Sequence, residues 1–197
     1  MKKILFIATG GTIASGNSGG GLTPEKTAGE LLSGIEIPGA EVRAVQPFSL
    51  DSTNLTPRHW TELAVLIRDN WRDYDGFVIA HGTDTMAYGA AALYCLIQNP
   101  DKPVIFTGSQ LPIGEQGSDA PGNLEDAFRC AVQGRAGVWV CFCGRVIAGN
   151  AVRKVHTRDF DAFRGFTQAD ELTVDDFCTG EPRPEGGTLF FNRLDPK

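Results

Sequence analysis

Short, continuously apolar runs separated by helix-length segments constrain the fold of this chain more than any other feature. The runs are Lys3–Ala8, Phe77–Ala80, Val104–Thr107 and Val138–Phe142, with a less hydrophobic strand expected at Glu41–Phe48. A strand covered by helices on both faces has no polar face, so its side chains do not alternate with polar ones. The pattern therefore predicts a three-layer α/β fold with a mostly parallel, flavodoxin-like sheet and helices on both faces.

Helices are expected between these strands. The segment from Thr56 begins with Thr-Pro, a helix-start signal, and continues with apolar residues at helical spacing. The other predicted helices are Pro24–Leu32, Met86–Ile97 and Asn123–Gln133. The alternation fails after Arg164, so we expect a domain over residues 1–163. We expect residues 164–197 to be a linker, with Gly180–Gly187 as its Pro-, Gly- and Glu-rich part and Thr188–Phe191 as a last strand.

Charge and cysteine content narrow the class of function. The net charge of -6 argues against a nucleic-acid partner or an acidic membrane surface. The first apolar run is too short for a signal peptide, and five cysteines, mostly in apolar runs, suit buried thiols in a reducing compartment. We therefore expect a cytoplasmic protein. No CxxC or paired-His spacing suggests a metal site, so neither a metal nor another cofactor is expected.

In open parallel sheets ligands bind beyond the carboxyl ends of the strands. After the first strand, Gly10 and Gly11 let the backbone turn tightly and leave Thr12 with an exposed hydroxyl. This loop lacks both GxGxxG and GxxxxGK[ST], so nucleotide binding is poorly supported. On this motif alone, the more common explanation is that the Thr12 hydroxyl only bonds backbone donors within a turn. The Gly-rich stretch Ser15–Gly21 has the composition of a mobile flap.

Polar side chains also follow the later strands. In the loop Ala80–Met86, the hydroxyl of Thr83 and the carboxylate of Asp84 are able to polarise an alcohol and hold an ammonium group, although one residue of Thr83–Thr85 is also expected to cap a helix. A histidine in the position of His81 more often has a structural role than the role of a general base. The residues Asp51–Asn54 fit either a carboxylate-binding loop or an ordinary turn. Lys154 is either a surface charge or, if partly buried, an activator of a hydroxyl.

Taken together, these loops resemble the L-asparaginase family in order and spacing. The resemblance is carried by Ala8–Ala14, Ile79–Met86, Gly149–Val155, Phe160–Phe163, Val104–Pro112 and Gly117–Leu124. It covers nearly the whole chain and is closest to the cytoplasmic branch of the family, because the chain carries Asp51-Ser52-Thr53 and has no signal peptide. The family's smaller second domain is absent from this sequence.

The resemblance implies an enzyme that hydrolyses L-asparagine, with glutamine as a poorer substrate. Thr12 attacks the side-chain amide, and Thr83, Asp84 and Lys154 form a second catalytic group. Asp84 also meets the substrate ammonium. The resemblance matches Ser52 to the position that binds the α-carboxylate, with Thr53 beside it. The predicted substrate-binding residues are Gly11, Asp51, Ser52, Thr53, Gly82, Asp84 and Ser109, and backbone amides near Gly11 and Gly82 are the expected oxyanion donors. It also implies a homo-oligomer and a C-terminal domain as partners.

One departure from the family and two alternative functions remain. Many relatives carry a flap tyrosine that helps to activate the first threonine, and this chain has no tyrosine between Gly16 and Leu32. Another group, or a relay through substrate or water, would then activate Thr12.

The alternative functions are the amidase-like subunit of a tRNA-dependent amidotransferase and a binding module that senses asparagine or aspartate without hydrolysing it.

Overall fold

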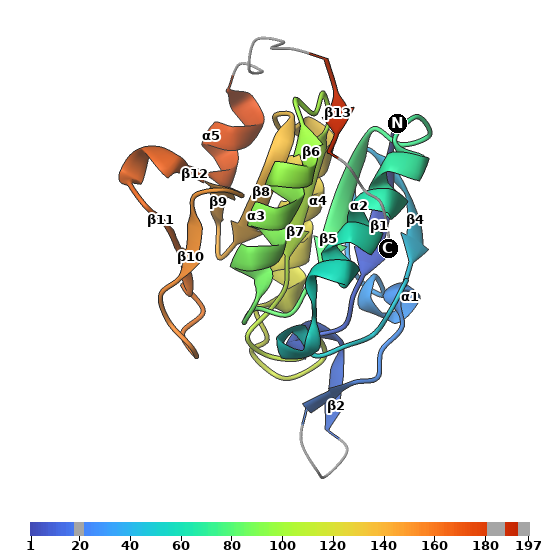
Figure 1. Ribbon diagram of the computed structural model, residues 1–197. Coiled ribbons are helices and arrows are strands. Elements are labelled where there is room, and N and C mark those ends of the chain that lie inside the picture. The colour runs from blue at the N-terminus through green and yellow to red at the C-terminus, as the bar shows by residue number, and fades with distance from the viewer. Residues whose placement is uncertain (18–21, 181–187, 193–197) are drawn as a thin grey trace.

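A seven-stranded sheet lies between two layers of helices in the computed structural model, which describes residues 1–17, 22–180 and 188–192 (Figure 1). In hydrogen-bonded order its strands are β12 (Glu171–Thr173), β9 (Arg145–Ala148), β8 (Gly137–Phe142), β7 (Pro103–Thr107), β5 (Gly76–Ala80), β1 (Lys2–Ala8) and β4 (Ala40–Val45). The strands from β8 to β4 are parallel to one another, whereas β9 pairs antiparallel with both of its neighbours, β8 and β12. The predicted α/β fold with a mostly parallel sheet is confirmed, and its parallel part has the flavodoxin-like order.

Two hydrophobic cores lie on opposite faces of this sheet. Successive side chains of a strand point to opposite faces, so Phe6 belongs to one core and Leu5 and Ile7 to the other. The first core packs against α1 (Ala28–Leu31), α4 (Ala120–Gln133) and α5 (Val174–Thr179). The second packs against α2 (Pro57–Asn70) and α3 (Met86–Leu96). Because both faces are covered, the central strands are apolar throughout.

Short elements surround the sheet. Three two-stranded pairs are formed by β2 (Ser15–Asn17) with β3 (Leu22–Pro24), β10 (Val152–Lys154) with β11 (Phe163–Gly165), and β6 (Ile97–Gln98) with β13 (Phe190–Phe191). Three 3₁₀ turns are Thr12–Ala14, Ser52–Asn54 and Gln168–Asp170. The predicted strand at Thr188–Phe191 is therefore shorter than expected. Residues 181–187 of the predicted linker and residues 18–21 of the predicted flap lie outside the described residues.

The predicted helix Pro24–Leu32 is wrong at its start. The helix begins after Thr27, whose hydroxyl accepts a hydrogen bond from Glu30 N while the Glu30 carboxylate accepts one from Thr27 N. This reciprocal cap defines the first turn of a helix. Upstream, the amides of Glu25 and Lys26 both donate to Ala14 O. These two bonds tie the segment to the loop after β1 and leave Pro24 in a strand.

Residues beyond the predicted boundary at 163 pack on the same sheet. The strand β12 pairs with β9, and α5 places the fully buried Phe177 against Trp139 with ring centroids 5.0 Å apart. The sequence pattern stops alternating here because these elements are short and one of them is an antiparallel edge strand. A domain boundary at residue 163, as predicted, would therefore separate β12 and α5 from the core that they cover.

The cysteines are all free thiols, but they are not all buried. Cys130 and Cys141 lie in the core with their sulfur atoms 4.0 Å apart, whereas Cys95 and Cys143 are exposed. The expectation of buried thiols is thus wrong for these two residues, because Cys95 lies on the outer side of α3 and Cys143 in the turn after β8. Across the described residues, no helix is both long and apolar enough to span a membrane.

Candidate active site

The predicted catalytic loops meet where β1 and β5 end side by side. A Cβ on Gly11 would lie 2.4 Å from Gly82 Cα, and a Cβ on Gly82 would lie 2.6 Å from Ser52 Cβ. Backbone hydrogen bonds hold the loops together, because Gly11 N donates to Leu50 O and Leu50 N donates to Thr9 O, both at 3.0 Å. These loops emerge at the lower edge of the sheet in Figure 1, beyond its carboxyl ends. Strands β4 and β5 flank β1 at this point, which is the topological switch point of the fold.

Thr12 lies in the first turn after Gly11. Gly11 has φ 77, in the region that favours glycine, and this turn brings the partly exposed Thr12 to the surface of the loop. The amide of Gly11 donates to Leu50 O, so this amide is already engaged. The prediction that backbone amides near Gly11 and Gly82 act as oxyanion donors stays a prediction, and near Gly11 it concerns amides other than that of Gly11 itself.

Thr83, Asp84 and Lys154 form one hydrogen-bonded group. Lys154 Nζ donates to Thr83 Oγ1 at 2.8 Å and to Asp84 Oδ1 at 2.7 Å. Thr83 is buried, the Lys154 side chain is 14% exposed, and the Asp84 side chain is 55% exposed. An ammonium group held against a hydroxyl stabilises negative charge that develops on its oxygen. The half-exposed Asp84 carboxylate remains accessible to a cationic ligand.

The β10–β11 hairpin positions Lys154. In this hairpin Lys154 pairs with Phe163, whose buried ring packs edge-on against Phe142 of β8 with centroids 5.0 Å apart. The hairpin is thereby anchored to the sheet on which Thr83 and Asp84 are carried. Thr83 and Lys154 are 71 positions apart in the sequence, and the local pattern gives no direct signal of this contact.

The helix-cap alternative does not explain Thr83 or Asp84. The residue at the cap position of α3 is Thr85, and its hydroxyl donates to Ser52 O at 2.8 Å instead of bonding the helix. The turn alternative holds for Asp51 and Thr53, because Asp51 Oδ1 accepts from Thr53 N at 2.8 Å and from Thr53 Oγ1 at 2.7 Å. Ser52 is buried next to Gly82. Among these three residues, Ser52 thus lies closest to the Thr83 loop.

Gln110 is a site residue that sequence reasoning missed. Thr83 Oγ1 donates to Gln110 Oε1 at 3.2 Å, and Gln110 Nε2 donates to the carbonyl oxygens of Thr157 and Asp159. Ser109, which was predicted instead, is buried and donates its hydroxyl to Leu111 O. Both residues lie in the loop after β7, beyond a carboxyl end of the sheet where ligands bind in such folds, and this position is the signal that could have pointed to Gln110.

Asp119 and Asn123 hold the Gln110 loop in place. The Asp119 carboxylate accepts from the amides of Gln110 and Leu111, and Asn123 Nδ2 donates to it as well. Asn123, which is buried, also donates to Gly108 O and accepts from Cys143 N. These two side chains therefore connect the loops after β7 and β8. The segment Gly117–Leu124 signalled family resemblance, but its residues alone indicated no role for either side chain.

His81 is buried in this loop and is neutral at physiological pH. Burial lowers the pKa of His81 to about 4, and its Nδ1 lies 2.8 Å from Gly82 O. The side chain is fully inaccessible, which favours the structural interpretation over a general base.

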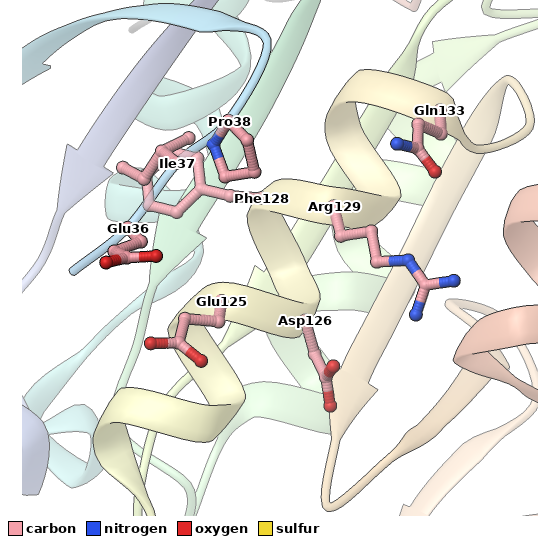
Figure 2. A pocket seen from close by; sticks show the side chains of 8 residues that line it. All are labelled: Glu36, Ile37, Pro38, Glu125, Asp126, Phe128, Arg129 and Gln133. Atoms are coloured by element: carbon pink, nitrogen blue, oxygen red, sulfur yellow. The ribbon is translucent and has the colours of Figure 1, made fainter.

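A separate pocket of about 400 Å³ lies beside α4. It is lined by Glu36, Ile37, Pro38, Glu125, Asp126, Phe128, Arg129 and Gln133, and Figure 2 shows the charged side chains around its mouth. Burial raises the pKa of Asp126. None of the predicted site residues lines this pocket. Among the described residues, no group of three or more His, Cys, Asp or Glu side chains is arranged to hold a metal ion.

Comparisons with known proteins find L-asparaginases and amidotransferase subunits that are similar to this chain. The L-asparaginase of Thermococcus kodakarensis is 38% identical over 205 residues, which cover 98% of this chain and 61% of that protein. Its solved structure has a TM-score of 0.85 at 35% identity and covers 96% of this chain and 60% of the other. One subunit of the glutamyl-tRNA(Gln) amidotransferase of Pyrococcus furiosus is 40% identical over 182 residues, covering 83% of this chain and 40% of that subunit.

The chain thus spans about three fifths of the L-asparaginase that it resembles. A family model described as "Asparaginase, N-terminal" matches residues 3–177, which contain every residue of the site described above. The chain therefore belongs to the asparaginase family, and residues 3–177 correspond to the N-terminal domain of that family.

Proposed function

We propose that this chain is the nucleophile-bearing part of a cytoplasmic amidohydrolase that converts L-asparagine and water to L-aspartate and ammonia. The observation that carries the proposal is the contact of Lys154 Nζ with both Thr83 Oγ1 and Asp84 Oδ1 beside the Gly11–Gly82 junction. A module that only binds its ligand does not need a mostly buried ammonium group directed at a threonine hydroxyl. Such a contact has a chemical use when the hydroxyl must exchange a proton or carry developing charge.

In the proposed reaction Thr12 Oγ attacks the side-chain amide carbon of asparagine. The hydroxyl proton of Thr12 passes to the leaving nitrogen as the C–N bond breaks, so that ammonia departs and an ester on Thr12 remains. Water attacks the Thr12 ester, releases aspartate and restores the hydroxyl. The amides of Thr12 and Gly82 donate to the oxyanion in both steps, a contribution typically worth about 10²–10³ in rate for each donor.

The other residues bind substrate or tune the second hydroxyl. Ser52 binds the α-carboxylate, and Asp84 binds the α-ammonium with its accessible carboxylate. Lys154 stabilises negative charge on Thr83 Oγ1, while Gln110 Oε1 accepts the hydrogen bond of that hydroxyl in the resting state. This arrangement allows Thr83 to pass a proton within the site without a flap tyrosine.

The remaining part of the protein completes the site in this proposal. Relatives are longer than this chain, and we propose that a C-terminal domain from a neighbouring subunit of a homo-oligomer closes over the substrate. Closure excludes water and strengthens the electrostatic contacts to the substrate. The chain alone should consequently hydrolyse asparagine poorly, with glutamine a poorer substrate still.

Ammonia release from asparagine tests this proposal directly. It should be measured for this chain, for the chain with a separately expressed C-terminal domain, and for a Thr12→Ala chain under the same conditions. Weak activity that rises when the second domain is added, and that depends on Thr12, is the expected result. Binding of asparagine without ammonia release under all conditions would support the sensing module instead.

A second candidate follows from the 40% identity to an amidotransferase subunit. In that case the ammonia would pass to a partner that modifies glutamyl-tRNA(Gln). Ammonia release that appears only when a partner subunit and this tRNA are added would favour the amidotransferase function. Release by the asparaginase domain pair alone would favour the hydrolase.

A further inference from the structure

Two buried ring nitrogens near the active-site loops have no hydrogen-bond partner among the described residues. They are His81 Nε2 and Trp60 Nε1, and neither atom is accessible to solvent. Buried polar groups in native proteins are almost always paired with protein or with an ordered water molecule. Two unpaired nitrogens in one region of the core therefore need an explanation.

The position of Gly89 in α3 shows that both nitrogens lie around the same point in the core. A Cβ built on Gly89 would lie 3.2 Å from His81 Nε2, 3.2 Å from Trp60 Nε1 and 3.4 Å from Phe106 Cε1. The two nitrogens are consequently separated by no more than twice the first distance. They do not bond to each other, yet they are close enough for one atom to bridge them.

The chemistry of the two nitrogens is complementary. Trp60 Nε1 carries a proton and can only donate. His81 Nδ1 lies 2.8 Å from Gly82 O, which only accepts, so Nδ1 must carry the imidazole proton and Nε2 is left as an acceptor. A water molecule accepts from one and donates to the other. An ammonium group cannot accept and a carboxylate cannot donate, so each fails one of these two requirements, and a methyl group fails both.

We propose that a buried water molecule beside Gly89 bridges Trp60 Nε1 and His81 Nε2, and that it holds His81 in the tautomer that donates to Gly82 O. His81 is then a positioning residue for the backbone between β5 and Thr83. Gly82 touches both Gly11 and Ser52, so its orientation affects three of the loops that form the site. This inference does not depend on which reaction the site performs.

The experiment is solution NMR on the chain labelled with ¹⁵N at histidine and tryptophan. The chain has three histidines and three tryptophans, so each signal can be assigned by substitution. We expect His81 to be the Nδ1–H tautomer at neutral pH. We also expect the Trp60 indole proton to show a cross-peak to a long-lived water. Trp71 and Trp139 are internal controls, because their indole nitrogens donate to Asp101 and Ala136 O.

Gly89→Ala places a methyl group at the point that both nitrogens surround, where the water is proposed to bind, and it displaces the two rings by only about a few tenths of an ångström. Gly122→Ala is the matched control, because Gly122 is also on a helix and a Cβ there meets nothing within 4 Å. The Trp60 cross-peak should disappear in Gly89→Ala and remain in Gly122→Ala. An Nε2–H or charged His81, a missing cross-peak in the unmodified chain, or a cross-peak that survives Gly89→Ala would each overturn the proposal. The tautomer of His81 and the Trp60 cross-peak in the unmodified chain decide the proposal even if Gly89→Ala fails to fold.

The positioning role has its own readout. His81→Asn keeps a donor near the position of Nδ1, whereas His81→Leu keeps none. The amide chemical shifts of Gly82, Thr83 and Gly11 should stay near their original values in His81→Asn and move in His81→Leu. Equal shifts in the two variants would show that the imidazole only fills space.

Discussion

Gly11 and Gly82 lie in direct backbone contact, with room for a side chain on neither residue. A Cβ on Gly11 would be 2.4 Å from Gly82 Cα, which is far inside any contact that real side chains make. The close approach of these two loops brings Thr12 and Thr83 to the same edge of the sheet. The site thus depends on two glycines that sit beside the reactive residues.

Gly11→Ala should consequently lower the free energy of unfolding by more than the backbone conformation of Gly11 alone explains. Gly34 has a similar positive φ, 79 against 77, but a Cβ there meets nothing within 4 Å. Gly34→Ala should cost about 1–2 kcal/mol in the free energy of unfolding, the usual penalty for a left-handed residue. Gly11→Ala should lower the free energy of unfolding clearly more than Gly34→Ala does. Urea titration of the two variants measures this difference. Equal costs would mean that the Gly11 and Gly82 loops separate without penalty.

Thr12→Ala and Thr83→Ala should each lower kcat for asparagine by a factor of at least ~10³ in a protein that includes the second domain, because only binding and oxyanion contacts remain. Thr9→Ala is the control. Thr9 is buried, and its hydroxyl donates to Ala80 O away from the reactive groups, so its loss should affect kcat much less. Wild-type turnover by Thr12→Ala would identify Thr12 as an ordinary turn residue.

Lys154→Met should lower kcat much more than it raises KM, because the ammonium contacts the Thr83 hydroxyl and not the proposed substrate. Asp84→Asn should also raise KM, since it removes the counter-charge proposed for the substrate ammonium. Steady-state kinetics of the two variants separates these effects. Small and equal changes in both would reduce the group to a structural ion pair.

Asp161 should make the chain sensitive to strong acid. The guanidinium groups of Arg164 and Arg145 lower the pKa of Asp161 from 3.8 to about 2. The unfolded chain therefore binds a proton more readily than the folded chain between these values. This contribution to stability is complete above about pH 4 and is lost as the pH falls toward 2.

Thermal unfolding followed from pH 5 to pH 2 measures this effect. Asp161→Asn should flatten the pH dependence of Tm in that range, although it also lowers Tm at pH 5 by removing the pair. Asp159→Asn is the control, because the Asp159 side chain is exposed and its carboxylate lies 3.6 Å from His156 Nδ1. An unchanged pH profile in Asp161→Asn would show that other carboxylates dominate acid unfolding.

Local sequence patterns determined the architecture and the positions of the reactive loops. The runs around Phe6 and Phe77 predict strands covered on both faces, and Gly10 and Gly11 mark a loop in which the backbone turns tightly. These signals are short in range, because each depends on side-chain polarity or backbone freedom within a few residues. Strand ends were accordingly predicted more closely than the start of α1, where the Thr27 cap competes with the apolar pattern.

Only the tertiary structure decided which side chains meet. Thr83 donates a hydrogen bond to Gln110 and accepts one from Lys154. These two partners lie 27 and 71 positions from Thr83 in the sequence. Such contacts depend on the order of strands in the sheet and on the direction of the β10–β11 hairpin. Periodicity predicts a parallel sheet with helices on both faces, but it does not specify which side chains of neighbouring loops come into contact. Burial and hydrogen bonding across the whole chain select those contacts, and with them the residues that surround Thr83.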